Sequence, residues 1–195
     1  IRSEATVPYK TDRLANPKLT QPLVDIPQTI SVINSEVIRE QGAASLMDAL
    51  RNTPGITMQL GEGGNTSAGD TFQLRAFSTQ TATFIDGIRD LGAITRDIFN
   101  IDQVEVVKGP AGTDIGRGAA SGYINLISKL PTRTDQYGVT TTVNTANNKR
   151  VTADLNKQLG EKSAARLNLM GKAGGVEGRN VGENNGYAIA PSYAW

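Results

Sequence analysis

The sequence predicts two regions within its 195 residues: an α+β domain with a short mixed sheet, two short helices and long loops, followed by longer antiparallel strands. Three observations predict this division. Before Pro131, short apolar runs alternate with polar, glycine-rich segments. After Pro131, segments of about ten residues have one apolar and one polar face, as transmembrane β-strands have. Only 38% of the residues are hydrophobic and 5% aromatic, which favours extended and loop structure over a large core.

The composition excludes several classes of function. The chain has 20 Lys and Arg against 19 Asp and Glu, so its net charge of +1 lacks the basic excess of nucleic-acid-binding proteins. It has no Cys and no His, which excludes thiol nucleophiles, disulfides, histidine acid–base catalysis and Cys/His metal sites. No run approaches the about 18 consecutive apolar residues of a transmembrane helix, so any membrane-spanning part must consist of strands.

The N-terminal region is predicted to be an extended arm. Residues 1–22 are polar, contain three prolines and show no periodicity. A short strand follows, in which Ile30 and Val32 lie on one face. Pro27 confines this strand to a sheet edge because proline cannot donate a hydrogen bond to a neighbouring strand.

Two short helices are predicted next. The first lies near residues 35–41, with an N-cap at Asn34 or the serine after it, and ends at Gly42. The second begins with a capping box in which Asp48 follows Ser45 by three residues. The sequence "TPG" ends this second helix.

The rest of the α+β domain is predicted to contain a long loop and several strands. Residues 56–70 form a polar, glycine-rich loop, and residues 71–77 read as a strand. "ATFIDGIRD" is a hairpin, because the pair Asp86–Gly87 tolerates positive φ. "DQVEVVKGP" and "GYINLISK" are two further strands with apolar alternation.

The strands after Pro131 fit two architectures. Alternation runs through residues 137–144, 151–159 and 165–170, and it suits either a transmembrane barrel or a soluble antiparallel sheet. Three or four strands cannot close a barrel, and open edges are not tolerated in lipid. If the strands are membranous, we therefore expect the chain to be part of a longer protein.

The segment 104–129, "VEVVKGPAGTDIGRGAASGYINLISK", carries five glycines and invites comparison with phosphate-binding loops. No two of these glycines have the spacing of a P-loop, and no Gly-Lys-Ser/Thr occurs. The dinucleotide-binding pattern also fails, because Ser121 occupies its third glycine position and a strand rather than a helix follows. The glycines are therefore interpreted as structural, permitting tight bends in a confined space.

Five segments occur in the order and spacing of the plug domain of TonB-dependent outer-membrane receptors. They are "DIPQTISVI", "SLMDALRNTPGI", "FQLRAFSTQTATFIDGIRD", "IDQVEVVKGPAG" and "GRGAASGYINLISKLP". Residues 21–133 resemble this domain, and the strands that follow resemble the start of the family's barrel. "TQPLVDIPQTI" and "GEGGNTSAGD" are most similar to ferric siderophore receptors of the catecholate type. Two departures are the "RAF" at 75–77 in place of "RGF", and the "TDIG" at 113–116 in place of "LYG".

The resemblance implies a domain order and an architecture. Residues 1–20 would be an N-terminal arm with a possible TonB contact, 21–133 the plug, and 134–195 the first strands of the β-barrel. The full protein would close these strands into a 22-stranded barrel that the plug occludes.

The resemblance also implies a bacterial outer-membrane receptor for TonB-energised import of a ferric siderophore. Its partners would be TonB with the inner-membrane energising complex, the ferric siderophore and outer-membrane lipid, but no nucleic acid. No catalysis, no covalently bound cofactor and no metal held by the protein are expected, because the siderophore itself chelates the iron. The alternative is a surface or secreted β-rich binding or adhesion module without transport.

Candidate ligand-binding residues follow from the family's three apex loops, 59–70, 75–82 and 89–97. Ferric catecholates are anionic, so cations and aromatic faces are expected there. The candidates are Arg75, Phe77, Gln80, Arg89, Leu91 and Arg96. Simple ion pairs are the competing interpretation for the three arginines: Arg75 with Asp70 or Asp86, Arg89 with Asp90, and Arg96 with Asp97.

Two further groups of residues carry weaker expectations. Glu105, Lys108 and Arg117 are predicted to form ion pairs between plug and barrel wall. Glu4, Thr6 and Val7 stand at positions loosely suited to a TonB contact.

Overall fold

The structure is a computed structural model. It describes residues 9–16, 19–59, 69–112, 115, 120–145, 147–175 and 182–195. The chain divides into two compact units, Ile1–Ser128 and Lys129–Trp195. Within the described ranges, no helix is long and apolar enough to cross a membrane.

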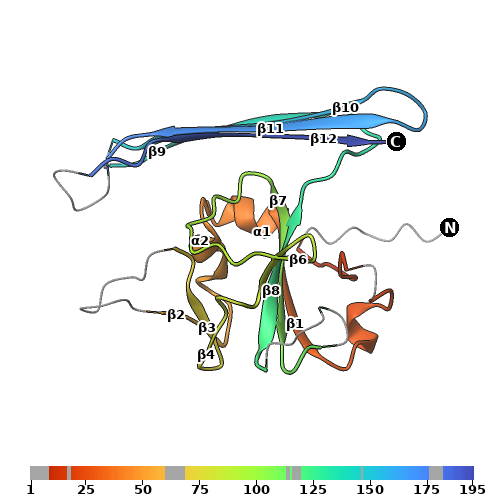
Figure 1. Cartoon of the computed structure of the whole chain (residues 1–195). Helices are drawn as coiled ribbons and strands as arrows, with labels where there is room; N and C mark the ends of the chain where they lie inside the picture. Colours follow the sequence, from red (N-terminus) through yellow and green to blue (C-terminus); the bar gives the residue numbers. More distant parts are fainter. Residues whose placement is uncertain are drawn as a thin grey trace. The chain divides into compact units, whose positions relative to one another are not determined.

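The first unit is built on a five-stranded sheet with the strand order β1-β7-β8-β5-β6 (Figure 1). Its strands are β1 (Thr29–Asn34), β5 (Thr83–Ile85), β6 (Ile88–Arg89), β7 (Ile101–Lys108) and β8 (Gly122–Ser128). Neighbouring strands are antiparallel except β5 and β8, which are parallel. The edge position predicted for β1 is confirmed, although residues 23–25 form a single 3-10 turn, η1 (Leu23–Asp25), before it.

A second, smaller sheet has the order β2-β3-β4. Its strands are β2 (Ile56–Met58), β3 (Phe72–Leu74) and β4 (Phe77–Ser78). The predicted strand over residues 71–77 is therefore a hairpin that turns at Arg75 and Ala76. Both turn residues have positive φ, +50° and +69°, which is the backbone of the two-residue turns that join twisted strands. The Ala in "RAF" thus keeps a conformation that favours glycine, at a cost of roughly 1–2 kcal/mol.

The two predicted helices are confirmed with their caps. They are α1 (Ser35–Glu40) and α2 (Leu46–Leu50). The Asn34 side chain accepts a hydrogen bond from the Val37 N–H at 3.0 Å. The capping box of α2 is complete: the Asp48 N–H donates to Ser45 Oγ, and the Ser45 N–H donates to the Asp48 carboxylate, both at 3.2 Å.

Apolar residues pack on both faces of the five-stranded sheet. Val104 and Val106 of β7 belong to the larger core, which also holds Leu46 and Leu50 of α2. The smaller core has Val107 together with an edge-to-face aromatic pair, Phe84 and Tyr123, whose ring centroids are 5.7 Å apart. The strands β7 and β8 are thus buried on both faces, which explains their nearly continuous apolar sequences.

The hairpin predicted at Asp86–Gly87 is confirmed between β5 and β6. Its turn residues have φ of +51° and +78°. The Asp86 carboxylate accepts a hydrogen bond from the Ser128 N–H at 2.8 Å, and the Asp86 N–H donates to the Leu126 carbonyl at 2.9 Å. The turn is therefore fixed to the end of β8.

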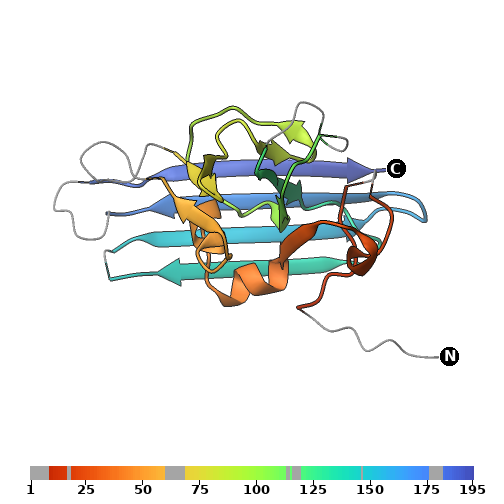
Figure 2. The same ribbon diagram turned by 90° about the horizontal axis from the view of Figure 1, so that it is seen from below.

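The second unit is a four-stranded antiparallel sheet with the order β12-β11-β10-β9. Its strands are β9 (Gln136–Val143), β10 (Lys149–Gln158), β11 (Ala164–Ala173) and β12 (Gly186–Ala194). Figure 2 shows the four strands side by side. With the mixed sheet and the two helices of the first unit, these strands confirm the fold class predicted from the sequence.

The register of this sheet separates an apolar face from a polar face. Leu155 pairs with Leu167, and Leu167 pairs with Pro191, so the three side chains form one row across the sheet. On the other face, Arg166 binds Asp154 through Nε and Nη2, both at 2.8 Å. The apolar face is open to its surroundings: the exposed fractions of Val139 and Ile189 are 70% and 66%.

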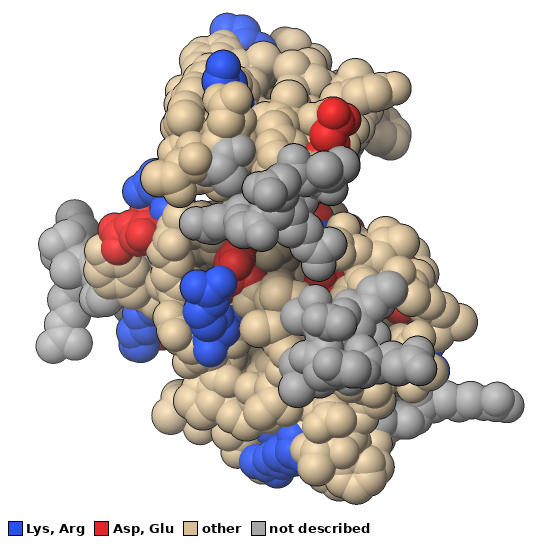
Figure 3. Space-filling model, turned by 90° about the vertical axis from the view of Figure 1, so that its left-hand side faces the viewer, with Lys and Arg blue, Asp and Glu red and all other residues tan. Residues whose placement is uncertain are grey.

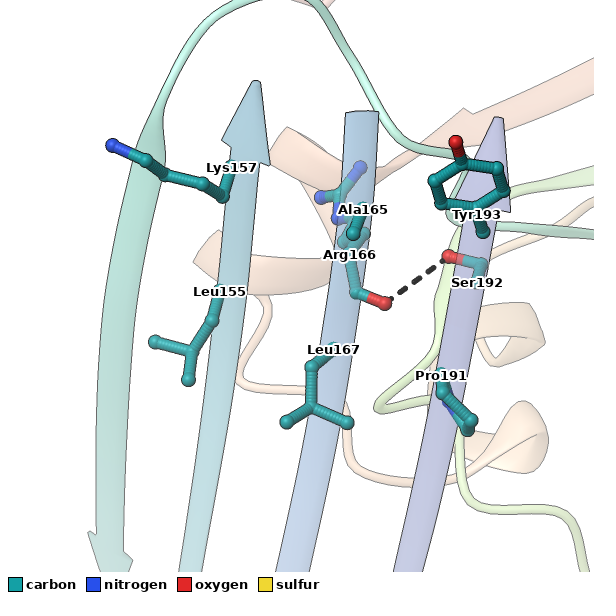
Figure 4. A pocket seen from close by; sticks show the side chains of 8 residues that line it. All are labelled: Leu155, Lys157, Ala165, Arg166, Leu167, Pro191, Ser192 and Tyr193. Carbon is teal, nitrogen blue, oxygen red and sulfur yellow. Dashed lines mark hydrogen bonds between the residues drawn. The ribbon is translucent and has the colours of Figure 1, made fainter. Parts of the chain in front are cut away.

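A shallow, almost wholly apolar hollow lies on this sheet (Figure 4). It is lined by Leu155, Lys157, Ala165, Arg166, Leu167, Pro191, Ser192 and Tyr193. The Ser192 hydroxyl donates to the Arg166 carbonyl at 3.3 Å, across β11 and β12. Because its polar groups serve the sheet itself, we regard the hollow as part of the apolar sheet surface.

Candidate functional site

Three of the six candidate ligand residues lie on or just after the β3–β4 hairpin. Arg75 is a turn residue and is exposed. Phe77 is 58% exposed, which is unusual for an aromatic side chain that merely packs. Gln80 is exposed on the loop that follows, where its N–H donates to Ser78 Oγ at 3.3 Å. The hairpin therefore offers a cation, a ring and an amide to an external ligand.

Arg89 and Leu91 lie on β6 and on the loop that follows it. The Arg89 guanidinium stands over the Phe84 ring, 5.4 Å from its centroid, and is half-buried. This cation–π contact holds the arginine in place and leaves part of it at the surface. Leu91 is 64% exposed.

Arg96 has a different environment from the other candidates, because its side chain is only 6% exposed. Its Nε and Nη2 donate to Asp90 Oδ2 at 2.9 and 2.7 Å. Nη2 also donates to the Gly92 carbonyl at 2.7 Å. Nη1 donates to the Ile94 carbonyl at 3.1 Å and to Asp70 Oδ2 at 3.4 Å. All five guanidinium donors are thus engaged, so the geometry does not favour direct ligand contact by Arg96.

The two aspartates around Arg96 differ in electrostatics. Burial raises the pKa of Asp70 above its usual range, although the Arg96 N–H and guanidinium oppose this. The Gly92 N–H lowers the pKa of Asp90 most; burial opposes this, and the hydrogen bond and charge of Arg96 add to the lowering. Asp70 and Asp90, which the sequence offered as partners for Arg75 and Arg89, therefore both bind Arg96. Within the described part of the chain, one Asp70 oxygen, Oδ1, is buried without a hydrogen bond.

Lys108 at the end of β7 is a half-buried cation near Arg75. Its Nζ donates to Ser31 Oγ at 3.3 Å. Burial, and then the charge of Arg75, lower the pKa of Lys108 below its usual value. The charges of Arg75 in the β3–β4 turn and Lys108 at the end of β7 are thus close enough to influence each other. The predicted pairing of Lys108 with a barrel wall stays a prediction.

Glu105 is fully buried and its partners belong to the first unit. Oε1 accepts hydrogen bonds from the Ala15 N–H at 2.7 Å and from Gln103 Nε2 at 2.8 Å. Oε2 accepts one from Asn125 Nδ2 at 3.1 Å, and Asn125 Oδ1 in turn accepts from the Gly87 N–H at 3.1 Å. These contacts favour an internal role that links the N-terminal arm to the β5–β6 turn. An ion pair between Glu105 and a barrel wall stays a prediction.

Sequence reasoning did not select Asn125, Asp70 or Asp90 as functional residues. Asn125 had a detectable signal, because it is a polar residue inside the apolar run "GYINLI", directly across from Glu105 in the register. Asp70 had no comparable signal, because it follows a glycine-rich polar segment.

Several predicted residues fall outside the described part of the chain. They are Glu4, Thr6, Val7 and Arg117, most of the loop 59–70, and three of the four residues of "TDIG".

On the side of the molecule shown in Figure 3, Lys and Arg form small separate groups rather than one continuous basic area. Across the described residues, no group of three or more acidic side chains could hold a metal ion. On the side that Figure 3 shows, recognition of an anion would depend on individual cations rather than on a broad field.

Comparison with known proteins defines the family. Residues 22–123 match the TonB-dependent Receptor Plug Domain, and the chain belongs to this family of bacterial outer-membrane receptors. It is 43% identical to the catecholate siderophore receptor Fiu of Escherichia coli K12 over 98% of its own length and 26% of Fiu.

Two crystal structures agree with this assignment. The closed form of Fiu matches with a TM-score of 0.89 and 42% identity, over 95% of this chain and 26% of that one. The siderophore receptor PiuA of Acinetobacter baumannii matches with a TM-score of 0.88 and 39% identity, over 95% and 26%. The chain therefore spans about a quarter of these relatives. They are receptors rather than enzymes, and an adhesion module receives no support.

Proposed function

We propose that this chain is the plug and the first four barrel strands of an outer-membrane receptor that imports a ferric siderophore of the catecholate type. The observation that carries the proposal is the likeness to a catecholate receptor over nearly the whole chain, in both regions. Residues 1–20 would be the arm, 21–133 the plug and 134–195 the barrel strands. TonB, with its inner-membrane energising complex, would supply the energy, and Glu4, Thr6 and Val7 are the candidate contact.

The second unit supports a place in the membrane. Its apolar face carries exposed Val and Ile in its middle, and Tyr137, Tyr187 and Tyr193 lie near the strand ends, 63%, 87% and 64% exposed. Aromatic residues at both ends of an apolar band are typical of transmembrane barrels, which sit in lipid with this face outward. The remaining strands of a 22-stranded barrel would close the sheet.

The plug surface offers the chemistry that an anionic, aromatic iron complex needs. Arg75 and Lys108, whose charges influence each other, supply positive charge, while Phe77 and Leu91 supply apolar contacts. Gln80 and Arg89 add hydrogen-bond donors. The iron is chelated by the siderophore, so the protein needs neither a metal site nor a catalytic group, and the ferric siderophore is its cargo rather than a cofactor.

Charge recognition is tested by replacing Arg75 in the full-length receptor. Arg75→Ala should weaken binding of an anionic ferric catecholate about tenfold, as loss of one charge-assisted contact does, and that of a neutral ferric hydroxamate much less. Titration by fluorescence quenching measures both affinities. Arg39→Ala, which removes an exposed arginine on α1, is the control and should change neither. Equal losses for both ligands would contradict recognition by charge.

A further inference from the structure

We infer that Arg96 is a positioning residue, which joins the loop after β6 to residues 69–70 in one rigid frame and thereby holds Leu91 and Ile94 outward as an apolar contact for the aromatic rings of the ligand. The inference rests on the proposed siderophore binding. It assigns a role to Ile94, Asp70 and Asp90 that the sequence did not suggest.

The frame starts with the loop that follows β6. The Asp90 N–H donates to the Thr83 carbonyl at 2.9 Å, which fixes the start of the loop to β5. Asp90 Oδ1 accepts a hydrogen bond from the Gly92 N–H at 2.9 Å, while Oδ2 binds Arg96. Arg96 also binds the carbonyl groups of Gly92 and Ile94, so the loop folds around its guanidinium group.

The frame continues into the base of the second loop. Asp70 Oδ2 accepts a hydrogen bond from the Arg96 N–H at 2.7 Å, and the Asp70 N–H donates to the Ile94 carbonyl at 3.0 Å. Gly69 lies so close that an added Cβ would stand 2.7 Å from the Ala93 carbonyl oxygen. Residues 69–70 and 90–96 therefore move together as long as the Arg96–Asp70 contact is intact.

The frame is also attached to α2 and to the residues just before it. The Leu46 N–H at the start of α2 donates to the Arg96 carbonyl at 3.2 Å, and the Ile98 N–H donates to the Ala44 carbonyl at 3.2 Å. Both ends of the loop are thus attached to packed elements: Asp90 to β5 and Arg96 to α2.

Two large apolar side chains stand outward on this frame. Leu91 is 64% and Ile94 is 59% exposed, and Ala93 between them is exposed as well. The Arg96 guanidinium and the Asp90 carboxylate are engaged within the loop, so the loop holds these apolar side chains at the surface in one conformation. Such a preorganised surface binds a rigid ring at a small entropic cost. The ligand chemistry that fits is the apolar face of a catechol ring.

The test is a double-mutant cycle in the full-length receptor, with the ferric tris-catecholate of 2,3-dihydroxybenzoate as the probe. Arg96→Lys keeps the charge but cannot make five fixed hydrogen bonds. We expect it to weaken binding of the probe about tenfold, because the loop loses its preorganised conformation. In a receptor that already carries Leu91→Ala and Ile94→Ala, Arg96→Lys should have less than a threefold further effect.

Hydrogen exchange of the free receptor tests the frame without any ligand. Amides of residues 89–97 should exchange faster in Arg96→Lys, and those of residues 69–70 should follow, because they share its hydrogen bonds. Asp70→Ala, which removes the acceptor of the Arg96 N–H, should give the same pattern if Arg96→Lys does not fold. Arg51→Lys, in the exposed pair of Arg51 with Asp48, is the matched control and should leave exchange and binding unchanged.

Three results would overturn the inference. They are additive losses of affinity in the cycle, unchanged exchange at residues 89–97, and faster exchange at 89–97 without any change at 69–70. A wild-type receptor that binds no ferric catecholate would instead contradict the proposed function, and the exchange experiment would still decide whether Arg96 holds the two loops together.

Discussion

Removing the Glu105 carboxylate should release the N-terminal arm from the sheet. Three donors converge on this buried group: the Ala15 N–H, Gln103 Nε2 and Asn125 Nδ2, at 2.7, 2.8 and 3.1 Å. Ala15 is 90 residues away along the chain, so the carboxylate is a long-range tie between the arm and β7. Glu105→Ala leaves all three donors without this acceptor.

The magnitude follows from these contacts. A partly buried hydrogen bond to a carboxylate, such as that from the Ala15 N–H, contributes about 1–3 kcal/mol. Loss of the hydrogen bonds from Gln103 and Asn125 lowers the stability of the whole folded sheet. Loss of the hydrogen bond from Ala15 affects only the attachment of the arm to the sheet. Opening of the arm should therefore become easier by about 1–3 kcal/mol, which corresponds to roughly 5- to 150-fold faster exchange of its protected amides.

Hydrogen exchange followed by mass spectrometry measures this directly on peptides that cover residues 9–16 and 19–26. Glu105→Gln should give a smaller increase, because its carbonyl can still accept from Ala15 while its amide group faces that of Asn125. Glu36→Ala, at an exposed ion pair on α1, is the control and should leave the arm unchanged. Arm exchange in Glu105→Ala that equals the wild-type rate would refute the assignment of Glu105 as the tie.

Three further predictions concern the stability of the plug, followed by thermal unfolding. Ala76→Gly should stabilise it by about 1 kcal/mol, because Ala76 holds a φ of +69°. Gly122→Ala should prevent normal pairing of β7 with β8, because the added Cβ would collide with the Val107 carbonyl oxygen. The free energy of unfolding should therefore fall by more than about 3 kcal/mol. Asp90→Asn should lower the free energy of unfolding at neutral pH. The difference in stability between variant and wild type should shrink as the pH falls below 3.8, because the Gly92 N–H lowers the pKa of Asp90 in the folded protein.

Each of these three predictions has a control variant or a result that would contradict it. Gly138→Ala, at a β9 position with no atom within 4 Å of the added Cβ, should be neutral where Gly122→Ala is not. A lower melting temperature for Ala76→Gly would contradict the strain at that turn. The Asp90 carboxylate stabilises the folded protein above its pKa in the unfolded chain, and this stabilisation is lost as the pH falls. A stability difference between Asp90→Asn and the wild type that grows in acid would therefore contradict the prediction.

Local signals in the sequence were enough for the elements that depend on few residues. The caps of α1 and α2 follow from Asn34, Ser45 and Asp48, whose partners lie three residues away. The β5–β6 turn follows from Asp86–Gly87 because few residue pairs adopt its backbone. The alternation after Pro131 predicted the faces of β9, β10 and β11, since a period of two fixes the face of every side chain in a strand.

The contacts that build the candidate site depend on pairings far apart in the sequence. Arg96 was expected beside Asp97, yet its partners are Asp90 and Asp70, and the second is 26 residues away. The electrostatic effect of Arg75, in the β3–β4 turn, on Lys108, at the end of β7, likewise links two different sheets. Nothing in a sequence pattern specifies such pairs, because they follow from the packing of loops on the sheet.

The alanine in "RAF" illustrates a different limit. From the sequence, the loss of glycine at residue 76 put the turn geometry in question. The hairpin nevertheless keeps positive φ at Arg75 and Ala76, because the pairing of Leu74 with Phe77 fixes the backbone on both sides. Tertiary structure here overrides a local preference of about 1–2 kcal/mol.

The central claim is that this chain belongs to a receptor that imports a ferric catecholate with energy from TonB. The most direct test is uptake of radioactive iron from a ferric catecholate by iron-limited cells that carry the full-length gene, in strains with and without TonB. We expect saturable binding in both strains and uptake only where TonB is present. Equal uptake in the two strains, or no binding of any ferric siderophore in a panel, would contradict the account.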